Sequence, residues 1–177
     1  MLEKRRLLLG AICLLLLLFF VRRGPLWPGA VVALLGEGLQ LWAAGNLHKN
    51  IRLAASGPYR HLRNPMYLGR FLLGFGFLLF THSWPVLLGY VLIFSFYAHT
   101  RVLREEARLR QIFGSEYADY CRLVPRWLPR LRPAPAPAAS GFRWATAVLN
   151  HEHRVATGVV ITLLAFFLRV YLLGSRF

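Results

Sequence analysis

Five apolar runs dominate the chain and restrict the folds that it can adopt. A helix needs roughly 20 apolar residues to cross the hydrocarbon core of a bilayer. We therefore expect five membrane-spanning helices, at about 7–21, 26–47, 66–80, 84–99 and 155–173. Several of these runs are short, so we expect tilting or local thinning of the bilayer. The predicted fold is all-α, a polytopic integral membrane protein.

The flanks of the apolar runs predict their orientation. The run at 7–21 is followed by "RRGPLWP" rather than by a small-residue cleavage site, so we interpret it as a span and not as a signal peptide. Residues 48–63 carry four Lys or Arg and no acid, whereas residues 81–84 carry neither Lys nor Arg. By the positive-inside rule, 48–63 and the N-terminus face the cytoplasm. Arg22 and Arg23 then lie on the far side, against the rule.

The charge of the chain has a simple explanation in a membrane protein. Twenty-two Lys and Arg oppose seven acids, for a net charge of +15, which in a soluble protein would suggest nucleic acid. Here the arginines flank apolar runs, so topology and contact with membrane lipids account for them, and we expect no nucleic-acid partner. Cys13 and Cys121 predict neither a disulfide framework nor a metal site, and nothing completes a metal motif around His151 and His153.

Two polar segments, 48–67 and 101–132, fall on the same predicted membrane face. A helical hairpin joins them, and a short hairpin returns its end close to its start, so we expect the two segments to meet. This predicts three regions: two N-terminal spans at 1–47, a cytoplasmic site with its hairpin at 48–132, and a linker, interfacial segment and fifth span at 133–177. Within 101–132 we expect a helix that Gly114 stops or bends.

The first polar segment contains "SGPYRHLRNPMYLGR", in which two turn-forming pairs alternate with tyrosines. Gly57-Pro58 predicts one turn, and Asn64-Pro65 predicts a second turn that begins span three. Interfacial anchoring of Tyr59 and Tyr67 is one interpretation; a binding site is the other.

In the second polar segment, Arg101 and Glu105 share a helix face directly after span four. A solvated ion-pair stripe is the simpler interpretation of this face. A carboxylate beside several arginines stays ionised and would suit a cationic ligand. The apolar stripe that includes Leu109 and Phe113 we interpret as packing.

Together the stretches "SGPYRHLRNPMYLG" and "RVLREEARLRQIFGSEYADYCRLVPRWLP" resemble the isoprenylcysteine carboxyl methyltransferase family and the wider group of membrane phospholipid methyltransferases. The resemblance covers roughly residues 48 to 130. It implies S-adenosylmethionine bound at the cytoplasmic membrane boundary, with Arg101 on the acceptor side and Arg101 and Glu105 in the catalytic role. The implied cofactor contacts are Leu53, Tyr59, Asn64, Pro65, Tyr67, Glu105, Tyr117 and Tyr120. Asn64 departs from the family, in which many members have His before the proline.

The resemblance implies an S-adenosylmethionine-dependent methyltransferase that acts on a lipid or small lipophilic acceptor entering from the bilayer. The acceptor would be prenylcysteine carboxylate-like or phospholipid amine-like, and the compact size points to a prokaryotic inner membrane. One alternative is an NADPH-dependent membrane reductase of the sterol-reductase type, which has a similar "Tyr-x-x-Tyr-Cys…Val-Pro" pattern. Another is a non-catalytic membrane protein whose arginines only set topology. No oligomeric state is predicted.

Overall fold

The computed structural model describes residues 24–48, 51–135 and 141–172, and the regular elements in these ranges are all helices, with no strand among them. The expected first span at 7–21 lies outside the described residues. The elements are α2 (Trp27–Gly45), η1 (Gly57–Arg60), α3 (Pro65–Leu79), α4 (Trp84–Leu123), α5 (Trp144–Leu149), α6 (Glu152–Phe167) and η2, a π-helix at Leu168–Leu172.

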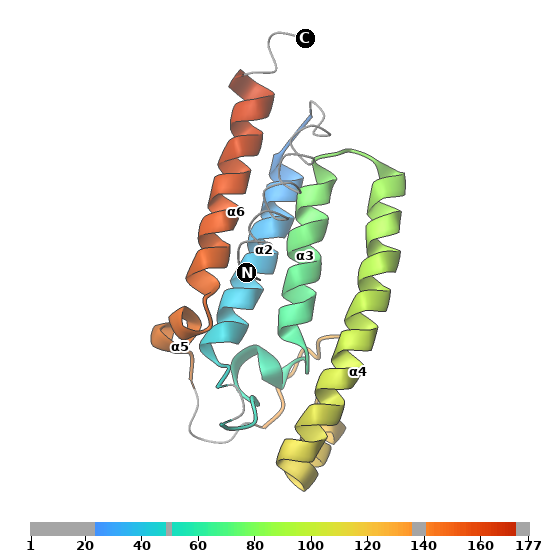
Figure 1. The fold of residues 1–177 in the computed structure, drawn as a ribbon, viewed down its shortest axis with the longest axis vertical. Coiled ribbons are helices and arrows are strands. Elements are labelled where there is room, and N and C mark those ends of the chain that lie inside the picture. The colour runs from blue at the N-terminus through green and yellow to red at the C-terminus, as the bar shows by residue number, and fades with distance from the viewer. Residues whose placement is uncertain (1–23, 49–50, 136–140, 173–177) are drawn as a thin grey trace, which may run out of the picture.

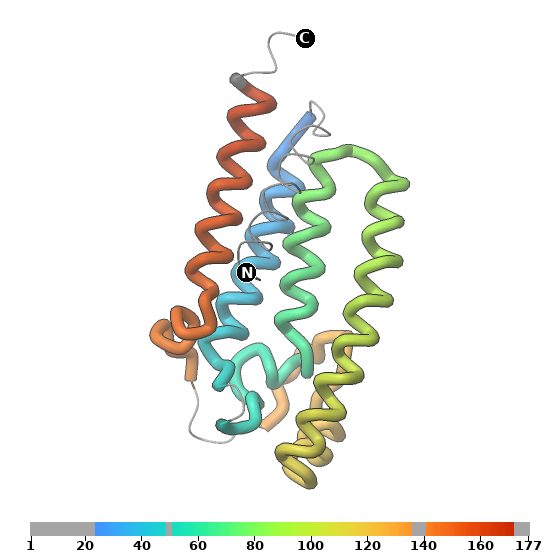
Figure 2. Tube along the Cα trace, viewed as in Figure 1, coloured from blue at the N-terminus to red at the C-terminus, as the bar shows by residue number. Residues whose placement is uncertain are grey.

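The four long helices lie side by side in the order α6, α2, α3, α4 (Figure 1). The chain passes down α2, up α3, down α4 and finally up α6 (Figure 2). As a result, residues 51–64 and the C-terminal part of α4 meet at one end of the bundle, and the α3–α4 turn lies at the other. The expected meeting of the two polar segments is confirmed.

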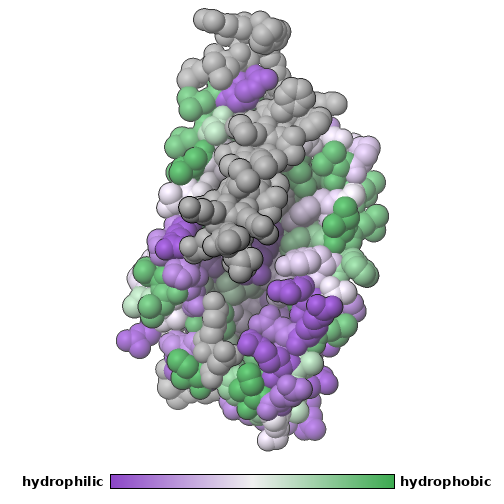
Figure 3. Space-filling model, in the orientation of Figure 1, coloured by the Kyte–Doolittle hydropathy of each residue, from purple (hydrophilic) through white to green (hydrophobic). Residues whose placement is uncertain are grey.

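Two of the described helical stretches are long and apolar enough to cross a membrane, α4 and the α6–η2 stretch Glu152–Tyr171, and α3 is a shorter apolar helix. The expected span at 26–47 forms α2. Large apolar side chains on α4, among them Leu92, Ile93 and Phe96, are more than 70% exposed. Hydrophobic residues cover the upper part of α4 and hydrophilic residues its lower part (Figure 3). This division fits a helix that leaves a hydrocarbon phase for a polar one.

Each of the first three apolar helices has a proline in its first turn: Pro28 in α2, Pro65 in α3 and Pro85 in α4. Proline is tolerated there because the first amides of a helix lack an intrahelical acceptor. The third span was predicted to begin at the Asn64-Pro65 turn. Helix α3 begins there, with Asn64 as its N-cap residue.

Small residues hold α2 and α3 close together. A Cβ atom built on Gly36 would lie 2.5 Å from the amide nitrogen of Leu73 and 2.7 Å from the carbonyl oxygen of Gly69. Gly29 and Gly76 oppose each other in the same way further along the pair. Glycine permits this close backbone approach, which is a common basis for helix packing in membranes.

Helix α4 joins the expected fourth span and the following polar segment without a break. Within Trp84–Leu123 the helix runs without interruption from the expected span to Phe113, and a kink at Gly114, where φ is 51°, separates it from a final helical segment that ends at Leu123. The predicted bend at Gly114 is therefore confirmed, and the helix ends before Pro125, as a following proline favours. The part of α4 before Gly114 thus carries side chains from the apolar zone directly to the polar end of the bundle.

Candidate active site

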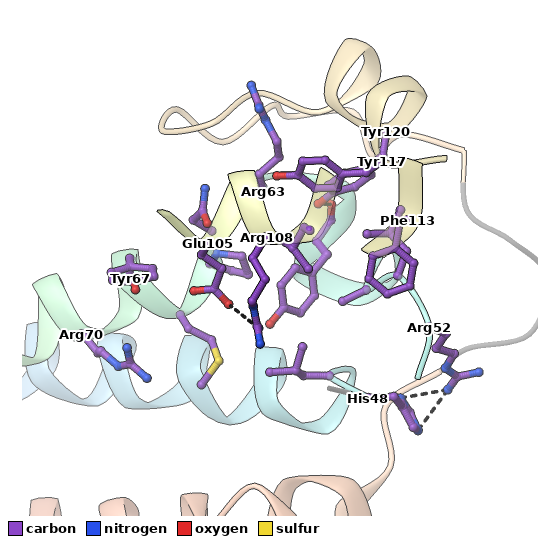
Figure 4. Close-up of a pocket in the computed structure, with 18 residues that line it drawn as sticks. His48, Arg52, Arg63, Tyr67, Arg70, Glu105, Arg108, Phe113, Tyr117 and Tyr120 are labelled. Atoms are coloured by element: carbon purple, nitrogen blue, oxygen red, sulfur yellow. Dashed lines mark hydrogen bonds and ion pairs between the residues drawn. The ribbon is translucent and has the colours of Figure 1, made fainter. Parts of the chain in front are cut away.

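A cavity of about 210 Å³ lies where the two polar segments meet. Its walls come from the chain that follows α2, from η1, from the first turns of α3 and from the C-terminal half of α4. The lining residues are Leu47, His48, Arg52, Leu53, Ala54, Tyr59, Arg63, Asn64, Pro65, Met66, Tyr67, Arg70, Glu105, Arg108, Leu109, Phe113, Tyr117 and Tyr120. Figure 4 shows how the lining side chains lie around the cavity.

The structure brings the predicted cofactor residues together. The cavity is lined by Leu53, Tyr59, Asn64, Pro65, Tyr67, Glu105, Tyr117 and Tyr120, which are all eight of them. Arg101 is an exposed residue outside the lining, and its side chain interacts with that of Tyr67. It therefore lies beside the cavity, one helical turn nearer to the apolar zone than Glu105.

A hydrogen-bonded turn positions the first half of the site. Gly57 has a φ of +55°, and a Cβ atom there would collide with the side chain of Asn46. Asn46 in turn donates from Nδ2 to the Trp42 carbonyl oxygen at 2.8 Å and accepts from the Ser56 hydroxyl at 3.0 Å. Only glycine fits this left-handed, crowded position without strain. The turn delivers Tyr59, which follows in η1, into the wall of the cavity.

The aromatic end of α4 positions the second half. Tyr117 is only 2% exposed, and it packs with Tyr120, Val124 and Ala134 in a small core. The Tyr120 hydroxyl donates to the main-chain carbonyl oxygen of Tyr59 at 2.8 Å. The two halves of the cavity are therefore tied directly to each other. Leu109 and Phe113, expected to pack, do pack against this core, and they also line the cavity.

Adjacent glutamates on α4 have different surroundings. Glu106 is buried and accepts from Nε and Nη2 of Arg126 at 3.0 and 2.7 Å, and from Nη1 of Arg63 at 3.2 Å. Glu105 instead lines the cavity, and its nearest described cation is Arg108, 4.0 Å away. Sequence reasoning missed Glu106. The signal was available, because Ala98, Val102 and Glu106 recur every four residues on the buried face of α4.

The cavity is strongly basic. Arg52, Arg63, Arg70 and Arg108 line it, and Glu105 is the one acid among the lining residues. Two further interactions hold these cations in place. Arg52 Nη2 hydrogen-bonds the His48 ring at 3.0 Å, and the Arg70 guanidinium carbon lies 5.4 Å from the centre of the Tyr67 ring.

None of Arg52, Arg63, Arg70 and Arg108 was predicted to line a binding site, because topology and lipid contact also account for arginines in this region. Their spacing alone does not separate the two explanations, because which arginines face the cavity depends on the turn at Gly57 and on the rotation of α4.

Burial raises the pKa of Tyr59, Tyr117 and Tyr120 above the ordinary value for a phenol. At neutral pH all three hydroxyls therefore remain protonated. They act as hydrogen-bond donors and as apolar walls, and none of them is available as a base. The arginines and Glu105 thus share the cavity with three neutral tyrosine side chains.

Asn64, a lining residue of the cavity, has an unpaired side-chain donor. Its Nδ2 atom is buried, and among the described residues it has no hydrogen-bond acceptor. A buried amide without a partner costs free energy, so a ligand acceptor at this point would be stabilised. Aromatic faces, one carboxylate, several guanidinium groups and this amide suit a ligand that has a flat ring, a positive charge and a carboxylate. Within the described residues, no group of three or more His, Cys, Asp or Glu is placed to hold a metal ion.

Comparison with known proteins points in one direction. Residues 30–116 match the family model described as phospholipid methyltransferase. A protein-S-isoprenylcysteine O-methyltransferase from Schizosaccharomyces pombe is 28% identical over 94 residues, which are 53% of this chain and 40% of that protein. The Xenopus laevis protein of the same name is 29% identical over 116 residues, 59% of this chain and 40% of that protein. The chain thus matches about 40% of the length of these relatives. No solved structure matches it.

Proposed function

We propose that this chain, whose residues 30–116 match the phospholipid methyltransferase family model, is an integral membrane methyltransferase that uses S-adenosylmethionine. The observation that carries the proposal is the shared cavity. Tyr59 and Glu105 lie 46 positions apart on opposite sides of a helical hairpin, and both line one basic hollow at the polar end of the bundle. Both lie in stretches that resemble the family.

The cavity offers a complementary group for each part of the proposed donor. Glu105 is the anion that would face its positive charges, since no other acid lines the cavity. Arg52 and Arg108 are cations that would pair with its carboxylate. The unpaired amide of Asn64 would serve as a hydrogen-bond donor to the ligand. Asn64 occupies the position at which many members of the family that the sequence resembles have His, and we expect it to take over a cofactor contact there. Tyr59, Tyr117 and Phe113 would cover the flat ring.

When bound, the donor supplies a methyl group on a positively charged sulfur, which is already activated for transfer. The chain has to orient two reactants in line and to exclude water. The buried tyrosines provide the water-free wall. A carboxylate acceptor needs no base, which agrees with a cavity in which the tyrosines stay protonated. In such a transfer the S–CH₃ bond would break as the new bond to the acceptor oxygen formed, and the sulfur would keep the electron pair.

The acceptor side faces the bilayer in this proposal. Arg70 lines the cavity about one turn into the expected third span, and Arg101 lies beside the cavity, two residues past the end of the expected fourth span. Two guanidinium groups at this edge favour an anionic acceptor, prenylcysteine carboxylate-like, over a phospholipid amine-like one. The names of the two relatives agree with a carboxylate-type O-methyl transfer. We propose Arg101 as the residue that holds the acceptor.

We further propose five spans with the N-terminus and the cavity on the cytoplasmic side of a prokaryotic inner membrane. The arrangement of α2, α3, α4 and α6 supports this orientation, because the residues of the basic 48–63 loop that the structure describes and the arginine-rich part of α4 share one end. The three regions 1–47, 48–132 and 133–177 would then be the entry spans, the site, and a linker with the last span.

A methyl-transfer assay tests the proposed function. The purified protein in nanodiscs is supplied with methyl-labelled S-adenosylmethionine and a host lipid extract, and labelled products are identified by mass spectrometry. We expect a labelled lipophilic product with wild type and little with Glu105→Gln. A Glu116→Gln variant is the matched control, because Glu116 is an exposed acid on the same helix and outside the cavity. Absence of any labelled product across lipid extracts and synthetic prenylcysteines would contradict the proposal.

A further inference from the structure

The chain after α4 presents its apolar side chains outward. In the 124–135 loop, Leu128 is 81% exposed, Leu131 is 96% exposed and Trp127 is 40% exposed. Exposed side chains of this size next to one another are unusual on a surface that meets only water. The mechanism proposed above uses none of them.

The loop is nevertheless firmly attached to the protein. Its inner edge runs along residues 60–63: the Arg63 amide donates to the Pro125 carbonyl, the Arg130 amide to His61, and the Ala134 amide to Arg60, at 2.9 to 3.0 Å. Arg126 adds the bidentate ion pair to Glu106. Because the main chain is held on one side, the leucines point outward as a consequence of the fold rather than of fraying.

The position of Trp127 places the loop at the level where α4 leaves its apolar part. Its ring stacks on the ring of His99, with centroids 6.4 Å apart and planes 25° apart. His99 is the last residue of the expected fourth span. Tryptophan is enriched at this depth in membrane proteins, where its ring meets the headgroup region.

The charge of the loop has one sign. Arg126, Arg130 and Arg132 lie in it, and residues 124–135 contain no Asp or Glu. Arg126 pairs with Glu106, whereas Arg132 is exposed. Apolar side chains together with arginine, and without acids, are complementary to the surface of a bilayer that contains anionic lipids.

We propose that the 124–135 loop is an interfacial anchor that inserts Trp127, Leu128 and Leu131 into the headgroup region and binds anionic lipids through Arg132, its exposed arginine. The inference rests on the membrane orientation of the proposed function and is independent of methyl transfer. Since the loop also holds residues 60–63, lipid bound at the loop would stabilise one wall of the cavity. Anionic lipid would then raise the thermal stability of the protein.

Spin labels test the position of the loop. Single cysteines are introduced as Leu131→Cys, Phe96→Cys and Glu116→Cys after Cys13 and Cys121 are replaced by Ala, and the labelled proteins are placed in nanodiscs. Phe96 is 74% exposed within the expected fourth span, and Glu116 is exposed beyond the Gly114 bend. We expect the label at 131 to collide several-fold less with a water-soluble relaxing agent than the label at 116, and to approach the lipid-like behaviour at 96.

The outcomes separate the two proposals. If the label at 96 is lipid-like and the label at 131 is as water-accessible as that at 116, the anchor is wrong and the membrane placement stands. If the label at 96 is itself in water, the placement fails, and the anchor fails with it. Dipolar broadening at 131 that disappears on spin dilution would show contact between copies of the chain and overturn the lipid assignment.

A second measurement tests the charge of the partner. Melting temperatures are compared in nanodiscs of phosphatidylcholine alone and of phosphatidylcholine with phosphatidylglycerol. We expect the anionic lipid to raise the Tm of wild type, and Leu131→Asp/Arg132→Glu to lose that increase while melting like wild type in phosphatidylcholine. Arg110→Glu, an exposed arginine of α4, is the control and should keep the increase. Equal increases in wild type and the double variant would overturn the proposal.

Discussion

The hydroxyl of Tyr120 lies 2.8 Å from the main-chain carbonyl oxygen of Tyr59, to which it donates a hydrogen bond across 61 positions of sequence. Both residues are buried and both line the cavity. This bond joins the turn before α3 to the end of α4, so the cavity is closed on that side by the chain itself.

Replacing Tyr120 by Phe should destabilise the fold. The substitution keeps the ring in its core but leaves a buried carbonyl oxygen without its donor, which costs about 1–3 kcal/mol. For a chain of this size, each kcal/mol corresponds to a fall in Tm of about 2–4 °C. Thermal unfolding in detergent measures the change. Tyr171→Phe is the control, because Tyr171 is an exposed ring near the end of η2, and its variant should melt like wild type.

Alkaline pH should destabilise the protein through its buried tyrosines. Burial raises the pKa of Tyr59, Tyr117 and Tyr120 in the folded state above about 10, the value in an unfolded chain. Above pH 10 the unfolded chain therefore releases these protons while the folded chain keeps them, so stability is complete below that pH and falls as the pH rises further.

The chain contains only two lysines, so tyrosines dominate the titration in this range. Melting temperatures measured from pH 8 to pH 11 should fall above about pH 10, and the fall should be shallower in Tyr120→Phe. A Tm that stays level through this range in wild type would show that these phenols do not limit stability.

Glu105 and Glu106 should respond differently to the same substitution. Glu106→Gln removes the charge that two arginines share at a buried position, and breaking a buried ion pair from one side costs about 3–5 kcal/mol. Glu105→Gln removes only a partly exposed charge 4.0 Å from Arg108, so the Tm should change little. Ligand affinity should show the opposite order for any Glu106 variant that remains folded. Equal losses of Tm in both variants would contradict this division.

The close packing of α2 on α3 predicts a sharp contrast between two glycines of one helix. A methyl group at Gly36 meets the backbone of α3, whereas one at Gly38 has nothing within 4 Å. Gly36→Ala should lower the Tm, because two backbones must move apart. Gly38→Ala should raise it slightly, since alanine favours a helix by up to about 1 kcal/mol over glycine. Paired thermal melts in the same detergent decide between these directions.

The helical fold, the meeting of the two polar segments and the bend at Gly114 could all be predicted from apolar run lengths, turn residues and the direction that a hairpin imposes. The continuity of α4 was not predicted, because the change from apolar to polar residues after His99 resembles the end of an element. No helix-breaking residue lies there, so the helix continues from the apolar zone into the polar one.

The site residues that belong to the recognised sequence motifs could be predicted, and the others could not. Tyr59, Asn64 and Glu105 could be placed at one cavity because the resemblance paired their two stretches. The arginines that line the cavity could not be separated from those that serve topology, since both kinds lie beside apolar runs. The role of Glu106 depends on Arg126, which comes from an irregular loop whose path no periodicity describes.

Binding of the cofactor product tests the central claim most directly. Calorimetric titration of the protein in nanodiscs with S-adenosylhomocysteine, and separately with NADPH, should show saturable binding of the first and none of the second. Tyr59→Ala and Glu105→Gln should each weaken that binding by about tenfold, the loss of about 1.4 kcal/mol expected for one contact. Binding of NADPH alone, or equal affinity for S-adenosylhomocysteine in wild type and both variants, would contradict the account.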